Sequence, residues 1–323
     1  MRTIAAAVWT TAFIILVSSA AAADVWPSKP VKMIIGYPPG GGTDLVGRLA
    51  ADHLSKVFGQ PFVVENKPGA AGNLAGEFVV NAPADGYTLS VVGQSIMTVN
   101  SMLYKGLRFD AAKDFVPITL LVRLPVVLEV YKDTPVKTYA EFIDYVKKAG
   151  TSLNHGSPGI GTLPHLAGEL FKQRIGFQSV HVPYRGSPPF AQGMTQGELQ
   201  WSFDVANFAL QLSRSGAVRL LAVSSPTRHP SFPDVPTFTE LGVKDSEWSV
   251  WFGLVAKTGT PKDVIDKIAA EVGKAWSMPE NVARIRGAGF DPAASTPEEA
   301  ARFINVDRAL WSKVVRDNNI QAQ

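Results

Sequence analysis

The sequence predicts an α/β fold of two doubly wound domains. Short runs rich in β-branched and aromatic residues alternate with segments of helical periodicity along most of the chain. Two strand-like runs follow one another over residues 115–132 with no helix between them, which is typical of a crossing between domains. In addition, a glycine-rich turn between a strand and a helix occurs once in each half of the chain.

The first half of the chain shows the strand–helix alternation. Leu45, Leu49, Leu54 and Val57 recur near helical spacing, and Gly59 follows them as a stop signal. Strand–helix–strand order predicts a mostly parallel sheet with helices on both faces. The predicted strands cover residues 31–37, 61–66 and 86–93, and the predicted helices cover residues 43–59 and 72–82.

The second half follows the strand-like runs of residues 115–132, which Pro125 separates. We divide the chain into a signal peptide of residues 1–23, a first domain of residues 24–125 plus 250–323, and a second domain of residues 126–249. Further strands are predicted at 153–157, 179–184, 199–205, 218–225 and 248–257, and further helices at 138–149, 162–174, 188–196, 206–215, 261–276 and 296–317.

Residues 1–23 have the layout of a secretory signal peptide. Arg2 is followed by an apolar stretch and then by small residues up to Ala23, where we place the cleavage site. The alternative is an uncleaved membrane anchor, but the apolar core from Ala5 to Val17 is short against the roughly 20 residues that span a bilayer. We therefore expect an exported protein of the bacterial periplasm.

The composition narrows the class of protein further. The 323 residues include no cysteine, so an exported chain of this size must be stabilised by its core and not by disulfides. Hydrophobic residues make up 46% and charged residues 18%, which suffices for two ordinary cores. The net charge is only +3 and no run of lysine or arginine occurs, so nucleic acid is not an expected partner.

Two glycine-rich loops carry the candidate site. Residues 36–44 are GYPPGGGTD and residues 156–162 are GSPGIGT, and each lies between a predicted strand and a predicted helix. The first residues of a helix have backbone N–H groups without partners and a partial positive charge, which attract anions. One such loop alone could be only a tight turn, but its occurrence in both halves favours an anion held from two sides.

Nucleotide-binding and catalytic motifs do not fit these loops. No lysine follows the glycines as a P-loop requires, and the sixth position of a dinucleotide fingerprint is Leu45 or Pro164 instead of glycine. His155, His165 and His181 are scattered in the sequence and lack a zinc spacing. The sequence shows no nucleophile–base pair, so we expect no cofactor, no metal ion and no catalytic residue.

Three polar residues of the candidate site could also act as helix caps. Thr43 and Thr162 stand where their helices begin, and they could cap these helices while the same N–H groups bind a ligand. Asp204 is either a binding acid or the N-cap of a helix that begins at Val205.

Longer segments of the sequence resemble the Bug family, the extracytoplasmic solute receptors of tripartite tricarboxylate transporters. In the first half the similar segment runs from Trp26 to Leu89 and includes the loop GYPPGGGTD. In the second half the similar segments are SPGIGTLPHLAGELFK, VHVPYRGSPP, DVPTFTELG and GLVAKTGTPKDVIDKI. The resemblance implies a periplasmic binding protein fold, with two α/β domains around a ligand cleft, and a protein that is not an enzyme.

The resemblance also implies which residues bind the ligand. In such receptors the two glycine loops hold a carboxylate through backbone amides, hydroxyl groups and ordered waters. The matching residues are Tyr37, Pro38, Gly40, Gly41, Thr43 and Asp44 in the first loop, Ser157, Gly159, Gly161, Thr162 and His165 in the second loop, and Asn73, Ser95 and Asp204 in the cleft.

The expected function is capture of a small organic carboxylate in the periplasm and its delivery to the integral membrane subunits of a tripartite tricarboxylate-type transporter. We expect the receptor to act as a monomer. Two alternatives remain at this point. A ligand-sensing partner of a sensor kinase would have the same fold, and a hydrolase or lyase of the cell envelope would need a nucleophile–base pair.

The export prediction can be checked on the expressed full-length chain. The mature protein should begin near Asp24 and appear in the periplasmic fraction without detergent, because removal of residues 1–23 leaves no apolar segment of membrane-spanning length. N-terminal sequencing and cell fractionation are the measurements. A membrane-bound product that retains Met1 would contradict the prediction.

Overall fold

The structure is a computed structural model and describes residues 26–149 and 152–321. The predicted signal peptide, residues 1–23, lies outside the described residues. Within those residues, none of the helices combines the length and the apolar character that crossing a membrane requires.

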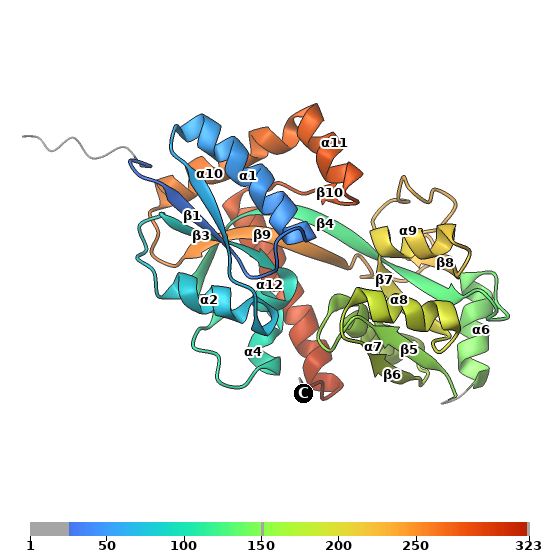
Figure 1. Ribbon diagram of the computed structural model, residues 1–323. Helices are drawn as coiled ribbons and strands as arrows, with labels where there is room; N and C mark the ends of the chain where they lie inside the picture. Colours follow the sequence, from blue (N-terminus) through green and yellow to red (C-terminus); the bar gives the residue numbers. More distant parts are fainter. Residues whose placement is uncertain (1–25, 150–151, 322–323) are drawn as a thin grey trace, which may run out of the picture.

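The ten strands of the described residues form one mixed sheet in the order β2-β1-β3-β9-β4-β7-β5-β6, and β8 and β10 also pair with β4 (Figure 1). β1 pairs in parallel with β2 and β3 at one end, and β5 pairs in parallel with β6 and β7 at the other. The two parallel parts confirm the predicted α/β class. The strands are β1 (Val31–Ile35), β2 (Phe62–Asn66), β3 (Thr88–Gly93), β4 (Phe115–Tyr131), β5 (Asn154–Ser157), β6 (Val180–Pro183), β7 (Trp201–Val205), β8 (Val218–Val223), β9 (Ser249–Lys257) and β10 (Asp291–Pro292).

β4 joins the two parallel parts of the sheet. It runs without interruption for 17 residues, so the prediction of two runs separated at Pro125 is wrong. Its antiparallel partner changes at this point, because Pro125 pairs with Ser249 of β9 and Val126 pairs with Val205 of β7. Proline has no N–H to donate to a ladder, and a change of partner is a position where a strand tolerates that loss.

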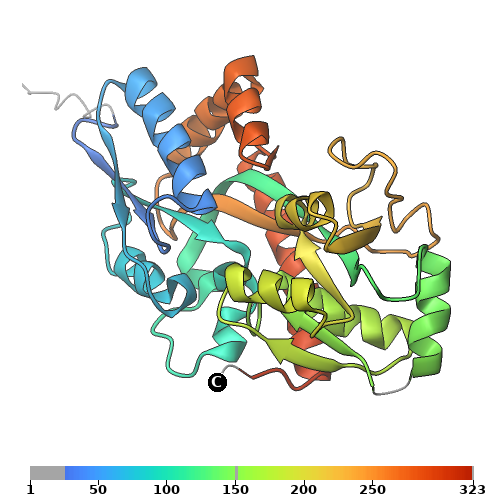
Figure 2. The same cartoon turned by 45° about the vertical axis from the view of Figure 1, so that its right-hand side comes forward.

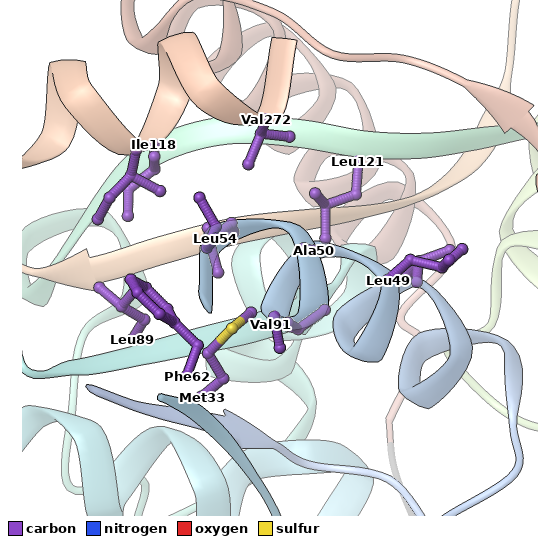
Figure 3. Close-up of a cluster of buried hydrophobic side chains, with 14 of the residues drawn as sticks. Met33, Leu49, Ala50, Leu54, Phe62, Leu89, Val91, Ile118, Leu121 and Val272 are labelled. Atoms are coloured by element: carbon purple, nitrogen blue, oxygen red, sulfur yellow. The ribbon is translucent and has the colours of Figure 1, made fainter. Parts of the chain in front are cut away.

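Helices cover both faces of the first part of the sheet (Figure 1). On one face α1 and α10 pack over the strands, and Figure 3 shows Met33, Leu54, Leu89 and Val272 meeting there, all fully buried. On the other face α2, α3 and α12 enclose a core that includes Ile34. The helices of this part are α1 (Gly42–Phe58), the short 3₁₀ helix η1 (Ala70–Gly72), α2 (Asn73–Val80), α3 (Gln94–Thr98), α4 (Asn100–Leu103), α5 (Ala111–Asp114), α10 (Lys262–Ser277) and α11 (Pro279–Gly287).

The second part of the sheet is also covered on both faces. Phe142 and Phe171 pack with Trp201 and Phe203 in an aromatic core on one face. Two smaller apolar clusters, one with Phe190 and one with Phe232, also lie in this part. The helices of this part are α6 (Tyr139–Ala149), α7 (Leu163–Ile175), α8 (Ser187–Gln196) and α9 (Ala206–Arg214).

The last helix, α12 (Pro297–Asp317), contacts both parts of the molecule. It begins at the predicted position, where Thr296 and Glu299 form a capping box. Ile304 near its start lies in the core of the first domain, whereas Trp311 near its end lies in the core of the second. Figures 1 and 2 both show α12 running past the middle of the sheet toward the second domain. The division drawn from the sequence assigns all of α12 to the first domain, but its last turns pack in the second.

A buried carboxylate fixes α12 where it crosses between the two cores. Asp307 accepts hydrogen bonds from Gln94 Nε2 at 2.9 Å, from Trp251 Nε1 at 2.8 Å and from Trp311 Nε1 at 2.6 Å. Burial raises the pKa of this carboxyl group, while the three donors stabilise its charged form. One side chain therefore ties α12 to α3 and β9.

Replacement of Asp307 by leucine should lower the free energy of unfolding by at least about 3 kcal/mol, because it leaves three buried N–H donors without an acceptor. Urea denaturation of the mature chain measures the change. Asp317→Leu is the matched control, since Asp317 lies on the same helix and pairs with Lys313 at the surface. Equal stabilities for the two variants would show that Asp307 does not anchor the helix.

Candidate functional site

The first glycine loop is organised by the side chain of Asp44. The chain leaves β1 at Ile35, Gly40 takes a left-handed conformation with φ 83°, and α1 begins at Gly42. Asp44 accepts hydrogen bonds at 2.9 Å from the Gly40 N–H and from Arg48 Nε, and its second oxygen accepts from Asn66 Nδ2 at 2.9 Å. A carboxylate four residues after the glycine therefore sets the shape of the loop.

These contacts hold the Asp44 carboxylate in its ionised form. Burial alone would raise its pKa, but the hydrogen bonds from Arg48, Gly40 and Asn66 outweigh burial and lower the pKa to about 2. Among the described residues, no hydrogen-bond acceptor faces the N–H groups of Gly42 and Thr43 in the first turn of α1. The loop thus holds an ionised acid and presents unpartnered amides beside it.

The start of α1 borders a cavity of about 350 Å³ between the two domains, which Gly42 lines and Thr43 does not. Gly40, Gly41 and Gly42 line one side of it. Its floor is formed by the strands that cross between the domains, with Leu124 from β4 and with Val250 and Phe252 from β9. The cavity therefore lies where β4 changes its partner.

The walls of the cavity come from segments that are distant in the sequence. At two places these segments approach each other so closely that only glycine fits. A β-carbon at Gly42 would lie 2.3 Å from the ring of Phe290, and one at Gly289 would lie 2.7 Å from Cβ of Asn207. The start of α1 therefore lies against Phe290, and Gly289, which follows α11, lies against Asn207 of α9. The apolar wall residues are Leu45, Val205, Phe208, Ala288 and Phe290.

Of the residues predicted for the first half of the site, Gly40 and Gly41 line this cavity. Tyr37 packs instead beside Gly72 and Gly93, and burial raises the pKa of its hydroxyl to about 12, with a further contribution from Tyr104. The remaining predicted residues of this half lie nearby without lining the cavity: Pro38 is exposed, Thr43 is buried in the first turn of α1, Asn73 accepts a 2.7 Å hydrogen bond from Asn100, and Ser95 lies in α3.

The second glycine loop is also held by its own side chains. Ser157 and Thr162 donate hydrogen bonds to the carbonyl oxygen of Gly159 at 3.1 and 2.7 Å. His165 Nδ1 accepts from the Gly161 N–H at 3.1 Å, again across four residues. A β-carbon at Gly161 would lie 2.3 Å from Leu103 of α4, so this loop touches the first domain. None of these five predicted residues lines the 350 Å³ cavity.

The three histidines are scattered in the sequence but lie together in the folded chain. The rings of His165 and His181 stack with centroids 3.8 Å apart, and His155 lies 5.1 Å from His181. The sequence separates them, but the parallel pairing of β5 and β6 and the start of α7 bring them together. The described residues contain no group of His, Cys, Asp or Glu side chains arranged to hold a metal ion.

This cluster contains a serine–histidine pair that the sequence did not reveal. Ser157 Oγ lies 2.8 Å from His181 Nε2. Burial and then repulsion from His165 lower the pKa of His181 to about 2, and burial lowers the pKa of His165 to about 4. A general base works best with a pKa near the ambient pH, so His181 is suited to orienting the Ser157 hydroxyl group and not to activating it.

Asp204 lies inside the second domain. The prediction that it caps α9 is wrong, because α9 begins at Ala206 with Val205 as its N-cap, and Asp204 accepts only the adjacent Val205 N–H at 2.7 Å. Burial raises the pKa of Asp204 to about 7. Burial and the nearby Asp204 raise the pKa of Glu129 well above its usual range. The two acids form a buried pair.

Comparison with known proteins decides the family. A sequence model described as "Tripartite tricarboxylate transporter family receptor" matches residues 46–320. The chain belongs to this family. It is 30% identical over 302 residues to "Protein BugT" of Bordetella pertussis, covering 93% of each chain. The resemblance inferred from the loop segments is therefore confirmed.

Solved structures resemble this receptor over nearly its whole length. "R. palustris Rpa4515 with adipate" is 32% identical with a TM-score of 0.77, covering 92% of this chain and 100% of that chain. "MatC (Rpa3494) from Rhodopseudomonas palustris with bound malate" is 30% identical with a TM-score of 0.71, covering 90% of this chain and 100% of that chain. The predicted periplasmic binding protein fold is thereby confirmed.

Sequence reasoning missed most residues that line the cavity of this receptor. Asn207 and Phe208 lie three and four residues after the predicted Asp204, and Phe290 and Ala288 lie in a segment for which no element was predicted. The one available signal was the position of Asn207 and Phe208 just after a strand end, where α/β folds place their ligands.

Loss of Asp44 should destabilise the receptor in a pH-dependent way. Its folded pKa of about 2 lies below the unfolded value of 3.8, so its contribution is complete above about pH 4 and is lost as the pH falls through 2. Asp44→Ala should therefore lower the free energy of unfolding by about 2 kcal/mol at pH 7. Urea denaturation at pH 7 and at pH 2.5 should show the difference shrinking.

The control is Asp52→Ala, because Asp52 lies on the same helix and makes only an exposed pair with Lys56. This variant should show little change at either pH. A difference between wild type and Asp44→Ala that stays constant over the pH range would contradict the role given to the Asp44 carboxylate.

Proposed function

We propose that this receptor captures a small organic carboxylate in the periplasm and delivers it to the membrane subunits of a tripartite tricarboxylate-type transporter, acting as a monomer. Membership of the receptor family supports this function. Two of its structural relatives hold adipate and malate, which are both carboxylates.

The observation that carries the proposal is the start of α1 at the cavity between the domains. The Gly42 and Thr43 amides point out of the first turn without partners, and Gly40 and Gly41 border the cavity. The Asp44 charge beside them is balanced by Arg48 at 2.9 Å. The helix end can therefore still attract an anion, typically by about 0.3–1 kcal/mol and by more when partly buried.

The second loop joins the first in the proposed binding of the carboxylate. Its hydrogen-bond acceptor is His165, which is neutral at pH 7 because burial lowers its pKa to about 4. Among the described residues, no acid lies in the first turn of α7, so the partial positive charge of this helix end is not compensated from within the helix. Closure of the domains would let both helix ends act on one carboxylate.

A negative charge at the N-cap of α1 should abolish carboxylate binding while the protein stays folded. Gly41 is exposed and has φ −77°, which any residue adopts, and an acid at a helix start favours folding. Gly41→Glu should weaken binding by on the order of 100-fold through repulsion of the ligand. Calorimetry with benzoate, adipate, malate and citrate on the mature chain measures the effect.

Gly41→Gln is the matched control, because it has the same shape without the charge. It should retain binding within a few-fold of wild type, which separates repulsion from steric blocking. If Gly41→Glu binds the same carboxylate as tightly as Gly41→Gln, the start of α1 is not the carboxylate site.

A further inference from the structure

The cavity between the domains has a chemistry that restricts the class of ligand. Among the described residues that line it, none carries a charged side chain. Its floor and walls are aliphatic and aromatic, and Phe252 and Phe290 lie with ring centroids 5.9 Å apart. Asn207 supplies the polar side chain of the lining, and its Oδ1 is buried without a hydrogen-bond partner.

We propose that this cavity takes the ring of an aromatic monocarboxylate, with the carboxylate at the start of α1 and a hydrogen-bond donor on the ring facing Asn207. The proposal rests on the function proposed above and names its ligand class. Backbone amides at one side and an apolar interior behind them fit a molecule that is charged at one end only.

The size of the cavity agrees with one ring. A volume of about 350 Å³ lies at the lower end of the range of small-molecule sites, roughly 300–1,000 Å³. Phe208, Phe252 and Phe290 present ring surfaces to it, and aromatic rings pack favourably edge-to-face or offset against one another. The interior of the cavity can therefore bury a ring against three aromatic side chains.

A second carboxylate would be unfavourable in the same space. A buried charge is tolerated only when a cation or several donors compensate it. Among the described residues that line the cavity, none is a lysine, arginine or histidine. Citrate or adipate would place a carboxylate among Leu124, Val250 and Phe290 without compensation.

Asn207 allows the site to distinguish one aromatic monocarboxylate from another. A buried acceptor without a partner favours a ligand that brings a donor, and it penalises the analogue that lacks one. A hydroxyl or amino substituent on the ring supplies such a donor. Among the three monohydroxybenzoates, at least one should bind roughly tenfold more tightly than benzoate.

Calorimetry on the mature chain tests the proposal with benzoate, the three monohydroxybenzoates, adipate and citrate. At least one of the benzoates should bind at least tenfold more tightly than adipate or citrate. Phe208→Ala should weaken that binding roughly tenfold. Phe78→Ala should not, because Phe78 is exposed to a similar extent, 37% against 40%, and lies on the outer face of α2. Asn207→Leu should remove the preference for the hydroxylated ring over benzoate.

The outcomes separate this inference from the proposed function. Tighter binding of adipate or citrate than of every benzoate would overturn the inference and leave carboxylate capture intact. Benzamide is the uncharged probe, and binding of benzamide as tight as that of benzoate would overturn carboxylate capture while leaving the aromatic cavity. Equal effects of Phe208→Ala and Phe78→Ala on a bound benzoate would overturn the placement of the ring. Absence of binding for the whole panel would overturn both.

Discussion

The arrangement of both domains depends on the unbroken strand β4. Up to Pro125 it pairs with β9, and from Val126 it pairs with β7. Because ladder hydrogen bonds hold each half of the strand to a different part of the sheet, the two parts can change their relative orientation most easily where the partner changes. Leu124, Val250 and Phe252 lie at this point and form the floor of the cavity. The floor of the cavity is therefore formed by residues that connect the domains.

The two glycine loops are alike in sequence but differ in what they can do. In each loop a side chain accepts the N–H of a glycine four residues before it, Asp44 for Gly40 and His165 for Gly161. The first acceptor is an ionised acid balanced by Arg48, and the second is a neutral imidazole packed on another histidine. The first loop borders the open cavity, whereas the second lies against Leu103 of α4. Similar motifs thus hold the same turn shape with different electrostatics.

Local patterns in the sequence were sufficient to predict most of the strands, the longest helices and the two loops, because periodicity and glycine turns act over short distances. The helix predicted at 296–317 is α12, which begins at Pro297 with Thr296 as its N-cap. The sequence could not predict that Pro125 stands inside one strand, since its tolerance depends on a change of partner in the sheet. The histidine stack and the cavity wall of Phe208 and Phe290 were missed for the same reason, because each is assembled from segments that meet only in the folded chain.

α12 limits how the domains can move relative to each other. Ile304 is packed in one core and Trp311 in the other, with Asp307 hydrogen-bonded between them. If the domains rotated about an axis distant from α12, one of these side chains would be pulled out of its core. The rotation axis of lowest energy therefore passes close to both α12 and β4. Points near a rotation axis move little, whereas contacts distant from it change most. The contact of α9 with the turn at Gly289, where Asn207 meets the residue that follows α11, joins the two domains directly beside the wall of the cavity. Domain motion would therefore act on the part of the site that we assign to the ring of the ligand.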